Sequence, residues 1–413
     1  MKMQVRVGAL AYGGAFVADI IDGDPETPKK KVFIRDVAPG EVVEAQLVSE
    51  EKNLIHASLL QVVEPSPARI TPPCPWFGAC GGCDLQHLNI DTQRDAKREM
   101  VERALQFQGK LKPLRGVTLI EAALPAFHYR RRVSLHLSEN GEIGFYRSGS
   151  GDVVDIEYCL LATDDLNAAL KSIRPLLPVL CPHIGGITLE QSQNEVFCVL
   201  QLRKGSHLEG TAFELAKTKI ANLIVEQNSK VLFIQHNFVA EKHPRFPAGH
   251  FSQVNESANQ VLVAEVLQSI ESTYVTELYA GAGNFSIPLA QRGTLVDAVE
   301  ADPYLARHGK DLVASLGLTD KISIFETTCE RYLQRTPPQE AILLDPPRSG
   351  AKTILKYFEP QKSKHIVYVS CSLPTLTRDL KELCAKGYTL ESVKVLDMFS
   401  QTHHVETLSV LKA

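Results

Sequence analysis

The 413-residue sequence has none of the features that mark a membrane-bound, secreted or repetitive protein. No apolar run approaches the length of a transmembrane span, and the N-terminal residues Met1 to Arg6 contain no signal-peptide core. No internal repeat and no long low-complexity tract is present. We therefore expect a cytoplasmic protein with no membrane partner. We also expect a monomer. The hydrophobic content of 44% is enough for sizeable cores, and the length predicts two or three domains.

The C-terminal part of the chain contains three strand-like runs with a reactive side chain at or near one end. They are 341–345, 365–371 and 405–411, and the side chains are Asp345, Cys371 and Glu406. The carboxyl ends of parallel strands share one crevice in an open α/β sheet, so Asp345 and Cys371 are expected to face one ligand. A thiol and two carboxylates suggest covalent catalysis on a planar ring. The alternative is that Cys371 is a small buried hydrophobic residue.

A glycine-containing turn precedes these runs. The sequence predicts a strand at 274–279, a turn with Gly281 and Gly283, a helix at 286–292 and a second strand at 295–299. Glycines let a backbone approach its ligand closely, and Glu300 follows at the distance of an acidic residue that binds ribose hydroxyls. The third glycine of the dinucleotide motif is missing, and Asn284 stands in a different register. This favours S-adenosylmethionine over NAD.

Five motifs, in order along nearly the whole chain, resemble the RNA uracil-C5 methyltransferases, which modify tRNA or large-subunit rRNA. The motifs are Phe251 to Asn255, Glu277 to Phe285, Leu344 to Gly350, Val369 to Cys371 with Thr375 to Leu380, and Thr402 to Thr407. The resemblance implies a Rossmann-like class I methyltransferase domain.

The resemblance also assigns roles to individual residues. It implies that Cys371 attacks C6 of the target uracil and that Glu406 removes the C5 proton after methyl transfer. It implies a pocket for S-adenosylmethionine and uracil, formed by Gln253, Tyr279, Gly281, Asn284, Glu300, Thr328 and Asp345. Among these, Gln253 and Asp345 are expected to line the pocket, and Tyr279, Asn284 and Glu300 to touch the methyl donor.

The chain departs from the family pattern at three places. Ser372 and Leu373 follow the cysteine where relatives have Asn-Pro, and Pro374 comes one place later. Thr328 stands where relatives carry Asn or Asp near the adenine, and Ser400 replaces a proline. None of these changes removes a reacting group, so they affect substrate preference and cofactor affinity more than the reaction type.

Three of the nine cysteines, Cys74, Cys80 and Cys83, lie in one turn-rich stretch with C-x5-C-x2-C spacing. Such spacing favours metal over disulfides, and both zinc and an iron-sulfur cluster are compatible with it. The family resemblance implies a [4Fe-4S] cluster with Cys159 as fourth ligand and Cys181 as runner-up. The spacing is not that of radical enzymes, so we expect a structural or RNA-facing cluster. We expect the remaining cysteines, Cys198, Cys329 and Cys384, to be packing residues.

The net charge of −4 does not suggest RNA binding, but the charge is uneven along the chain. From Arg94 to Arg147 there are eleven Lys and Arg against six Asp and Glu. Arg130, Arg131 and Arg132, beside His128 and Tyr129, are the best candidates for contact with RNA phosphates. The alternative is a solvated charged strand.

The first 63 residues contain five strand-like runs separated by turns, which predicts a small OB-like barrel. The runs are 5–10, 15–20, 31–35, 42–49 and 57–63. Residues 8–15 and 37–41 resemble the RNA-binding TRAM domain. We therefore expect three domains: a TRAM barrel at 1–63, a mixed central domain with the cysteine loop at 64–240, and the methyltransferase domain at 241–413.

The barrel and the cysteine loop together resemble the rRNA branch more than the bacterial tRNA branch, so rRNA is the expected partner and tRNA the alternative. Two other classes compete with this function. A degenerate RNA-binding protein has no reason to keep Cys371 together with Glu406. An amino-methyltransferase typically carries Asn-Pro-Pro-aromatic where this chain has Asp345 to Arg348.

Overall fold

The computed structural model describes residues 1–21, 30–192, 195–228, 230–235 and 253–413, and these form two compact units. The first unit comprises Met1–Pro73, Cys83–Ala123 and Gln260–Ala413, and the second comprises Cys74–Gly82 and Leu124–Asn259. The division into three domains stays a prediction. Among the described helices, none combines the length and apolar character needed to cross a membrane.

The N-terminal part of the first unit is a closed barrel with strand order β1-β2-β3-β5-β4. Its strands are β1 Lys2–Leu10, β2 Phe16–Ile20, β3 Lys31–Ile34, β4 Val42–Glu50 and β5 Leu54–Glu64. The alternating pattern in β1 buries every second side chain, as a strand in a barrel wall requires. The expected OB-like barrel is therefore confirmed, with strand ends within three residues of those predicted. The parallel pairing of β3 with β5 is a feature that the sequence pattern did not indicate.

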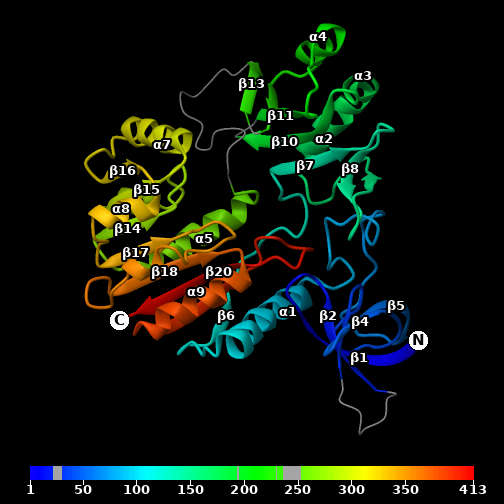
Figure 1. Ribbon diagram of the computed structural model, residues 1–413, viewed down its shortest axis with the longest axis horizontal. Helices are drawn as coiled ribbons and strands as arrows, with labels where there is room; N and C mark the ends of the chain where they lie inside the picture. The colour runs from blue at the N-terminus through cyan, green and yellow to red at the C-terminus, as the bar shows by residue number, and fades with distance from the viewer. Residues whose placement is uncertain (22–29, 193–194, 229, 236–252) are drawn as a thin grey trace. The chain divides into compact units, whose positions relative to one another are not determined.

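The rest of the first unit is built on an eight-stranded sheet with the order β16-β15-β14-β17-β18-β20-β19-β6 (Figure 1). Its strands are β6 Val117–Leu119, β14 Tyr274–Leu278, β15 Leu295–Glu300, β16 Ile322–Glu326, β17 Ala341–Leu344, β18 His365–Ser370, β19 Thr389–Leu396 and β20 Glu406–Lys412. The five strands from β14 to β18 are mutually parallel, whereas β20 runs antiparallel to both of its neighbours.

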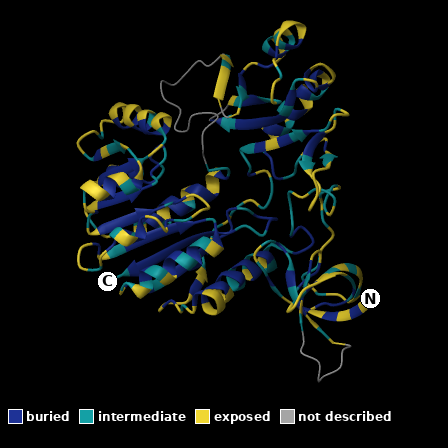
Figure 2. Ribbon diagram, in the orientation of Figure 1, coloured by how far each residue is buried: buried dark blue, intermediate teal, exposed yellow. Residues whose placement is uncertain are grey.

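Helices alternate with these strands and bury one face each against the sheet. They are α1 Ile90–Arg103, the π-helix η1 Ala104–Gly109, α5 Glu256–Ser269, α6 Ser286–Gln291, α7 Pro303–Ser315, α8 Cys329–Arg335, the 3-10 turn η3 Leu355–Tyr357 and α9 Leu373–Ala385. The first four residues of α5 belong to the second unit. Figure 2 shows the strands of the sheet in dark blue and much of α7 in yellow and teal. This is the burial pattern of an open α/β sheet covered by amphipathic helices.

The second unit contains a seven-stranded sheet with the order β13-β12-β11-β10-β7-β8-β9. Its strands are β7 Arg132–Leu137, β8 Ile143–Tyr146, β9 Val153–Asp155, β10 Ile184–Ser192, β11 Glu195–Leu202, β12 Leu223–Gln227 and β13 Lys230–Gln235. The accompanying helices are α2 Asp164–Ile173, η2 Arg174–Leu176, α3 Leu177–Leu180 and α4 Gly210–Lys219. Leu135, Ile187 and Leu200 lie in its buried core.

Candidate active site

The three reactive side chains predicted from the sequence lie at one edge of the eight-stranded sheet. Asp345 directly follows β17, and Cys371 directly follows the neighbouring parallel strand β18. Glu406 is the first residue of β20, which runs in the opposite direction beside β18. Ser370 pairs with Thr407. Cys371 directly follows the first of these residues and Glu406 directly precedes the second, so both lie at the same end of two adjacent strands. The antiparallel direction of β20 therefore brings a carboxylate to the edge where parallel strands end.

The carboxyl groups of Asp345 and Glu406 interact within this edge, where Glu406 is buried and Asp345 is half-buried. Burial raises the pKa of Asp345 above its ordinary value. Burial also raises the pKa of Glu406 well above its ordinary value, and the charge of Asp345 adds to this shift. Burial and the proximity of the two carboxyls therefore favour their protonated forms over two adjacent negative charges.

The Cys371 thiol is half-buried and its pKa is raised to about 11. Burial is the main cause, the charges of Glu406 and Asp345 add to it, and the Arg348 guanidinium acts in the opposite direction. A thiolate is the nucleophile, so positive charge at this edge would favour the reactive form. Arg348 was not singled out from the sequence, although it follows Asp345 within the same motif.

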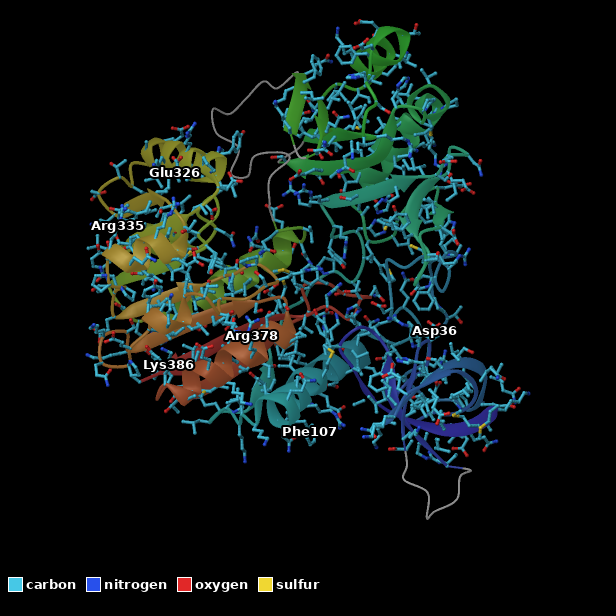
Figure 3. All side chains as sticks on the ribbon, viewed as in Figure 1. Asp36, Phe107, Glu326, Arg335, Arg378 and Lys386 are labelled. Atoms are coloured by element: carbon cyan, nitrogen blue, oxygen red, sulfur yellow. The ribbon has the colours of Figure 1, made fainter. Side chains whose placement is uncertain are left out.

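The loop after Asp345 is held by the helix that begins two residues after Cys371. The buried Asp379 carboxylate accepts hydrogen bonds from Ala351 N at 2.7 Å and Tyr368 Oη at 2.8 Å. Arg378 projects from α9 (Figure 3), donates from Nη2 to the Ser349 carbonyl at 3.0 Å and pairs with Asp379. Thus α9 fixes the loop that carries Asp345 relative to the strand that carries Cys371.

Gly350 is required where this loop meets α9. Its φ of +78° is unfavourable for other residues, and a Cβ at this position would lie 2.5 Å from Arg378 Nη2 and 2.6 Å from Asp379 Oδ2. The loop can therefore approach the Arg378 and Asp379 side chains only with glycine at this point.

The glycine turn joins β14 to α6 and is tied to the next strand. Gly281 N donates a hydrogen bond to Glu300 Oε2 at 2.8 Å, and Asp302 N donates to Glu300 Oε1 at 2.7 Å. Tyr279, at the start of the turn, has a φ of 66°, an uncommon conformation for a residue with a side chain. The Glu300 carboxylate is thus oriented by two backbone amides, and each oxygen keeps one further lone pair for a ligand.

Two other residues that were predicted to bind the methyl donor follow the carboxyl ends of strands β14 and β16 in the sequence. Asn284 is half-buried in the turn that leads into α6. Thr328 is the N-cap of α8, and its hydroxyl accepts a hydrogen bond from Arg331 N at 3.3 Å. Because Thr, Asn and Asp all cap helices well, the departure at position 328 keeps the capping interaction.

Glu277 is a buried carboxyl that sequence reasoning included in a motif without giving it a role. Burial raises its pKa to about 8, with contributions from the charges of Asp345 and Glu300, while a hydrogen bond from the Ser286 hydroxyl opposes the shift. Within the described residues, Glu277 Oε1 has no hydrogen-bond partner. Glu277 is the fourth of the five residues of β14, just before the glycine turn, and this position was the available signal in the sequence.

The second unit contains Gln253 and the three arginines. Gln253 is half-buried, and its predicted place in the uracil pocket stays a prediction. Arg131 pairs with Glu256, and Arg132 Nε lies 3.9 Å from the buried Glu190 carboxylate. All three arginines are half-buried, and the ion pairs of Arg131 and Arg132 already use part of the charge of these two side chains. Their role in RNA binding stays a prediction.

Of the four cysteines predicted to bind a metal, three lie in the second unit. Cys74, Cys80 and Cys159 interact electrostatically. Burial raises the pKa of Cys80 to about 11, and the charges of Cys159 and Cys74 contribute. Cys83 falls in the first unit, directly after Gly82. In the ranges that the structure describes, no group of three or more His, Cys, Asp or Glu side chains is arranged to hold a metal ion.

The remaining cysteines lie in apolar surroundings. Cys181, the runner-up ligand, packs in the core of the second unit, as does Cys198. Cys329 belongs to the core of the first unit, and Cys384 packs against it. The expected packing role of Cys198, Cys329 and Cys384 agrees with these positions.

Comparison with known proteins identifies the family. Residues 328–413 match the family model described as tRNA (Uracil-5-)-methyltransferase. A protein from Shewanella amazonensis named 23S rRNA (uracil(1939)-C(5))-methyltransferase RlmD is 32% identical over 440 aligned residues, which cover 100% of this chain and 96% of the relative. The chain belongs to the RNA uracil-C5 methyltransferase family. An RNA methyltransferase from Aquifex aeolicus is also 32% identical, over 99% of this chain and 98% of its own.

A solved structure of similar fold also matches nearly the whole chain. The Pyrococcus abyssi tRNA (uracil-54, C5)-methyltransferase, in complex with S-adenosyl-L-homocysteine, has a TM-score of 0.76 and 22% identity, and the match covers 99% of this chain and 100% of that one. The fold is therefore that of a class I methyltransferase joined to an OB-like barrel. Membership of the family makes the chain an RNA uracil-C5 methyltransferase and excludes the amino-methyltransferase alternative.

Proposed function

We propose that this enzyme transfers the methyl group of S-adenosylmethionine to C5 of one uridine in large-subunit rRNA, through a covalent adduct between Cys371 and C6 of the uracil. The observation that carries the mechanism is the meeting of Cys371, after β18, with Glu406, at the start of the antiparallel β20. A nucleophile and a carboxylate base are the two groups that this substitution needs on the enzyme.

Cys371 begins the reaction, because C5 of uracil is a poor nucleophile at neutral pH. Addition of the thiolate to C6 converts C5 into an enolate carbon, which takes the methyl group from the donor sulfonium and leaves S-adenosylhomocysteine. Glu406 then accepts the C5 proton, the C5–C6 double bond re-forms, and the thiolate departs from C6. Asp345 supports the position of the uracil, and the Arg348 guanidinium favours the thiolate.

The buried carboxyls give the site a preference for a positively charged donor. Asp345, Glu406 and Glu277 all have raised pKa values because burial disfavours their negative charge, and neighbouring carboxylates add to the shift for Glu406 and Glu277. S-adenosylmethionine supplies a transferable methyl on a sulfonium and also carries an ammonium group. Binding of a cation beside these carboxyls would lower their pKa values and favour the ionised form of Glu406 that accepts a proton.

We choose rRNA as the substrate because of a relative that matches this chain over nearly its full length. The Shewanella amazonensis relative carries 23S rRNA in its name and is 32% identical, whereas the name of the archaeal structure, at 22% identity, refers to tRNA. The test is to map 5-methyluridine in rRNA and tRNA from cells with and without the gene. Loss of one 5-methyluridine from large-subunit rRNA supports the proposal. Loss of 5-methyluridine from tRNA alone would show that the substrate is tRNA. The proposed reaction would still stand.

We also propose that the N-terminal barrel is a TRAM domain that binds RNA and that Arg130, Arg131 and Arg132 contribute to phosphate binding. Support for the barrel's role comes from its five-stranded closure and from the motif that ends in Glu41. The Glu41 carboxylate is buried and accepts hydrogen bonds from Ala38 N at 2.7 Å and from Arg69 Nε at 2.5 Å. This motif therefore anchors the linker after the barrel.

The cysteine loop, in our proposal, binds a [4Fe-4S] cluster through Cys74, Cys80, Cys83 and Cys159. Thiolate sulfur is the ligand that iron-sulfur clusters prefer, and three of these thiols already influence one another's charge. Cys83 is the residue after Gly82, so the loop itself supplies three ligands and the segment before α2 the fourth. The cluster would serve the structure or RNA contact and takes no part in methyl transfer.

A further inference from the structure

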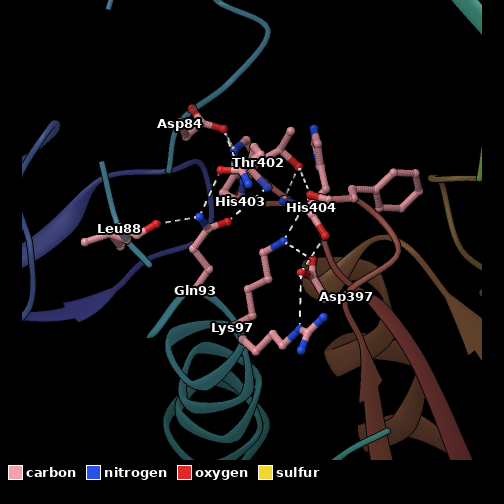
Figure 4. Close-up of polar contacts among 12 residues, drawn as sticks. Asp84, Leu88, Gln93, Lys97, Asp397, Thr402, His403 and His404 are labelled. Carbon is pink, nitrogen blue, oxygen red and sulfur yellow. Dashed lines mark hydrogen bonds and ion pairs between the residues drawn. The ribbon is translucent and has the colours of Figure 1, made fainter. Parts of the chain in front are cut away.

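The loop between β19 and β20 ends at Glu406, and side chains of helix α1 hold it (Figure 4). Gln93 Nε2 donates to Gln401 Oε1 at 2.9 Å, and Gln93 Oε1 accepts from Gln401 N at 3.0 Å. Gln401 has a φ of 71°, so its backbone is held in an uncommon conformation. All these residues belong to the first unit.

A second attachment lies one turn further along α1. Lys97 Nζ contacts Asp397 Oδ1 at 2.5 Å and donates to the Phe399 carbonyl at 3.1 Å. The side chains of Lys97 and Asp397 are 0% and 4% exposed, which makes this a fully buried ion pair. Lys97 therefore contacts the loop at two residues near its beginning, Asp397 and Phe399.

Ser400 completes the surroundings of the buried carboxylate. Its hydroxyl donates to Asp397 Oδ2 at 2.8 Å, so both carboxylate oxygens have a partner. Ser400 is the residue that replaces a proline of the family pattern. Proline has no hydroxyl, so this chain has a contact to Asp397 that a proline cannot make.

A third attachment lies nearest to Glu406. The Asp84 carboxylate lies 2.7 Å from His403 Nδ1 and accepts from His403 N at 3.2 Å. Asp84 N and Leu85 N both donate to the Gln401 carbonyl, at 2.9 and 3.0 Å. From Asp397 to His403 the loop is thus fixed by side chains and backbone of the segment that precedes and forms α1.

Stability alone is a poor explanation for the buried pair. Burial lowers the pKa of Lys97, and the charge of Asp397 and its hydrogen bond act in the opposite direction. Buried ion pairs of this kind can often be replaced by apolar residues with no loss of stability, whereas removal of one partner is costly. A role that needs a defined geometry accounts for the pair better.

We propose that Lys97 and Asp397 are positioning residues for Glu406: the pair fixes the loop so that the Glu406 carboxylate reaches the C5 proton of the methylated adduct. This inference rests on the proposed function, in which Glu406 is the base. It assigns the pair to one step, proton removal, and leaves attack by Cys371 and methyl transfer to other residues.

The test compares the wild-type enzyme with the double variant Lys97→Met/Asp397→Leu, which removes both charges together. A matched control is Glu359→Gln/Lys362→Met, which removes an exposed pair whose N–O distance is 3.0 Å. Three quantities are measured: the midpoint of thermal unfolding, the rate of covalent trapping on RNA that carries 5-fluorouridine, and turnover on RNA with uridine. Trapping needs no C5 proton removal, so it reports on the steps before Glu406 acts.

The expected result is a folded double variant with trapping close to the wild-type rate, turnover reduced at least tenfold, and a methylated covalent adduct that accumulates on uridine. Full turnover by the double variant would overturn the inference, and so would a loss of trapping as large as the loss of turnover. A wild-type enzyme that methylates no uridine would instead reject the proposed function itself.

Ser400→Ala provides a second test if the double variant does not fold. It removes only the hydroxyl that donates to Asp397. We expect turnover to fall a few-fold, trapping to stay unchanged, and a small amount of methylated adduct to build up. Equal reduction of trapping and turnover in this variant contradicts the assignment to proton removal.

Discussion

Thr407 donates a hydrogen bond from its hydroxyl to the Ser370 carbonyl oxygen at 2.8 Å, across the antiparallel pair of β18 and β20. These two residues directly adjoin Cys371 and Glu406 in the sequence. The nucleophile and the proposed base therefore belong to neighbouring strands whose register is set by both backbone and side chain. A slip of one residue would turn Glu406 to the other face of the sheet.

Replacement of the nucleophile tests the covalent mechanism. Cys371→Ala removes the thiolate that activates C5, and we expect methylation to fall below detection, together with any covalent complex on 5-fluorouridine RNA. The wild-type enzyme should give a complex that survives denaturation, visible as a shift on a denaturing gel. Turnover by the alanine variant would remove the thiol from the mechanism.

Replacement of the base tests the last step separately. Glu406→Gln keeps the shape of the side chain but cannot accept the proton. We expect it to bind S-adenosylmethionine, attack uracil and transfer the methyl, and then to stall as a methylated adduct on unmodified uridine. Mass spectrometry of the adduct checks this outcome. Release of methylated RNA at a near-normal rate would assign the proton transfer to another group or to water.

Asp345→Asn is the comparison for that experiment. Because Asp345 is proposed to support the position of the uracil, its loss should slow adduct formation from the start. The trapping rate on 5-fluorouridine RNA should therefore fall for Asp345→Asn and stay near normal for Glu406→Gln. The opposite pattern would exchange the two roles.

The buried carboxyl of Glu277 predicts a dependence of stability on pH. Its pKa is about 8 in the folded protein against an ordinary value of 4.5. Between these values the folded state keeps a proton that the unfolded chain has released, so the free energy of unfolding decreases as pH rises. One such proton corresponds to about 1.4 kcal/mol per pH unit.

Glu277→Gln should therefore show a flatter profile than the wild type from pH 5 to pH 8, without S-adenosylmethionine. The free energy of unfolding from denaturant titrations at each pH provides the measurement. Other carboxyls contribute to both proteins, so the difference between the two slopes is the informative quantity. Parallel profiles would show that Glu277 is ionised in the folded protein.

Two glycines of similar backbone conformation allow the cost of backbone strain to be distinguished from the cost of a steric clash. Gly350 and Gly317 have φ values of +78° and +67°, but a Cβ at Gly317 meets nothing within 4 Å. Gly317→Ala should cost about 1–2 kcal/mol, the ordinary penalty of this conformation. Gly350→Ala should cost more and also slow 5-fluorouridine trapping, because its Cβ displaces Arg378 or Asp379. Equal losses of stability and normal trapping in both variants would contradict the role given to α9.

The cluster proposal predicts a coloured protein. Purified without oxygen, the enzyme should be brown, contain iron and sulfide, and lose its visible absorbance when Cys74, Cys80, Cys83 or Cys159 is replaced by serine. Cys181→Ser is the control, since Cys181 packs in an apolar core, and it should keep the colour. Stoichiometric zinc without iron would overturn the cluster.

The strands of the barrel and the strands that carry the reactive side chains were predicted well from the sequence, because periodicity and turn residues act locally. The strand that leads to Cys371 was expected at 365–371 and is found at His365–Ser370, and the strand with Glu406 differs by one residue at each end. The prediction that Asp345, Cys371 and Glu406 lie at one edge followed from a general rule for parallel strands together with the family motifs.

The parts that the sequence did not reveal depend on contacts between distant segments. No periodicity shows that Lys97 pairs with Asp397 or that Gln93 faces Gln401, because each partner is an ordinary polar residue of its own segment. The raised pKa of Glu277 is equally invisible, since burial is a property of the folded sheet. The pairing of β6 with β19 was missed for the same reason.

That last pairing constrains how the chain can be cut and how it folds during synthesis. Val117 to Leu119 form an edge strand of the sheet although the long segment Leu124–Asn259 of the second unit lies between them and β14 in the sequence. A fragment that starts at residue 241 would leave β19 with an unpaired edge, open to association with other chains. On the ribosome, β6 emerges long before its partner and must wait for the C-terminal strands. Expression of a shortened catalytic fragment should therefore favour aggregation over a soluble enzyme.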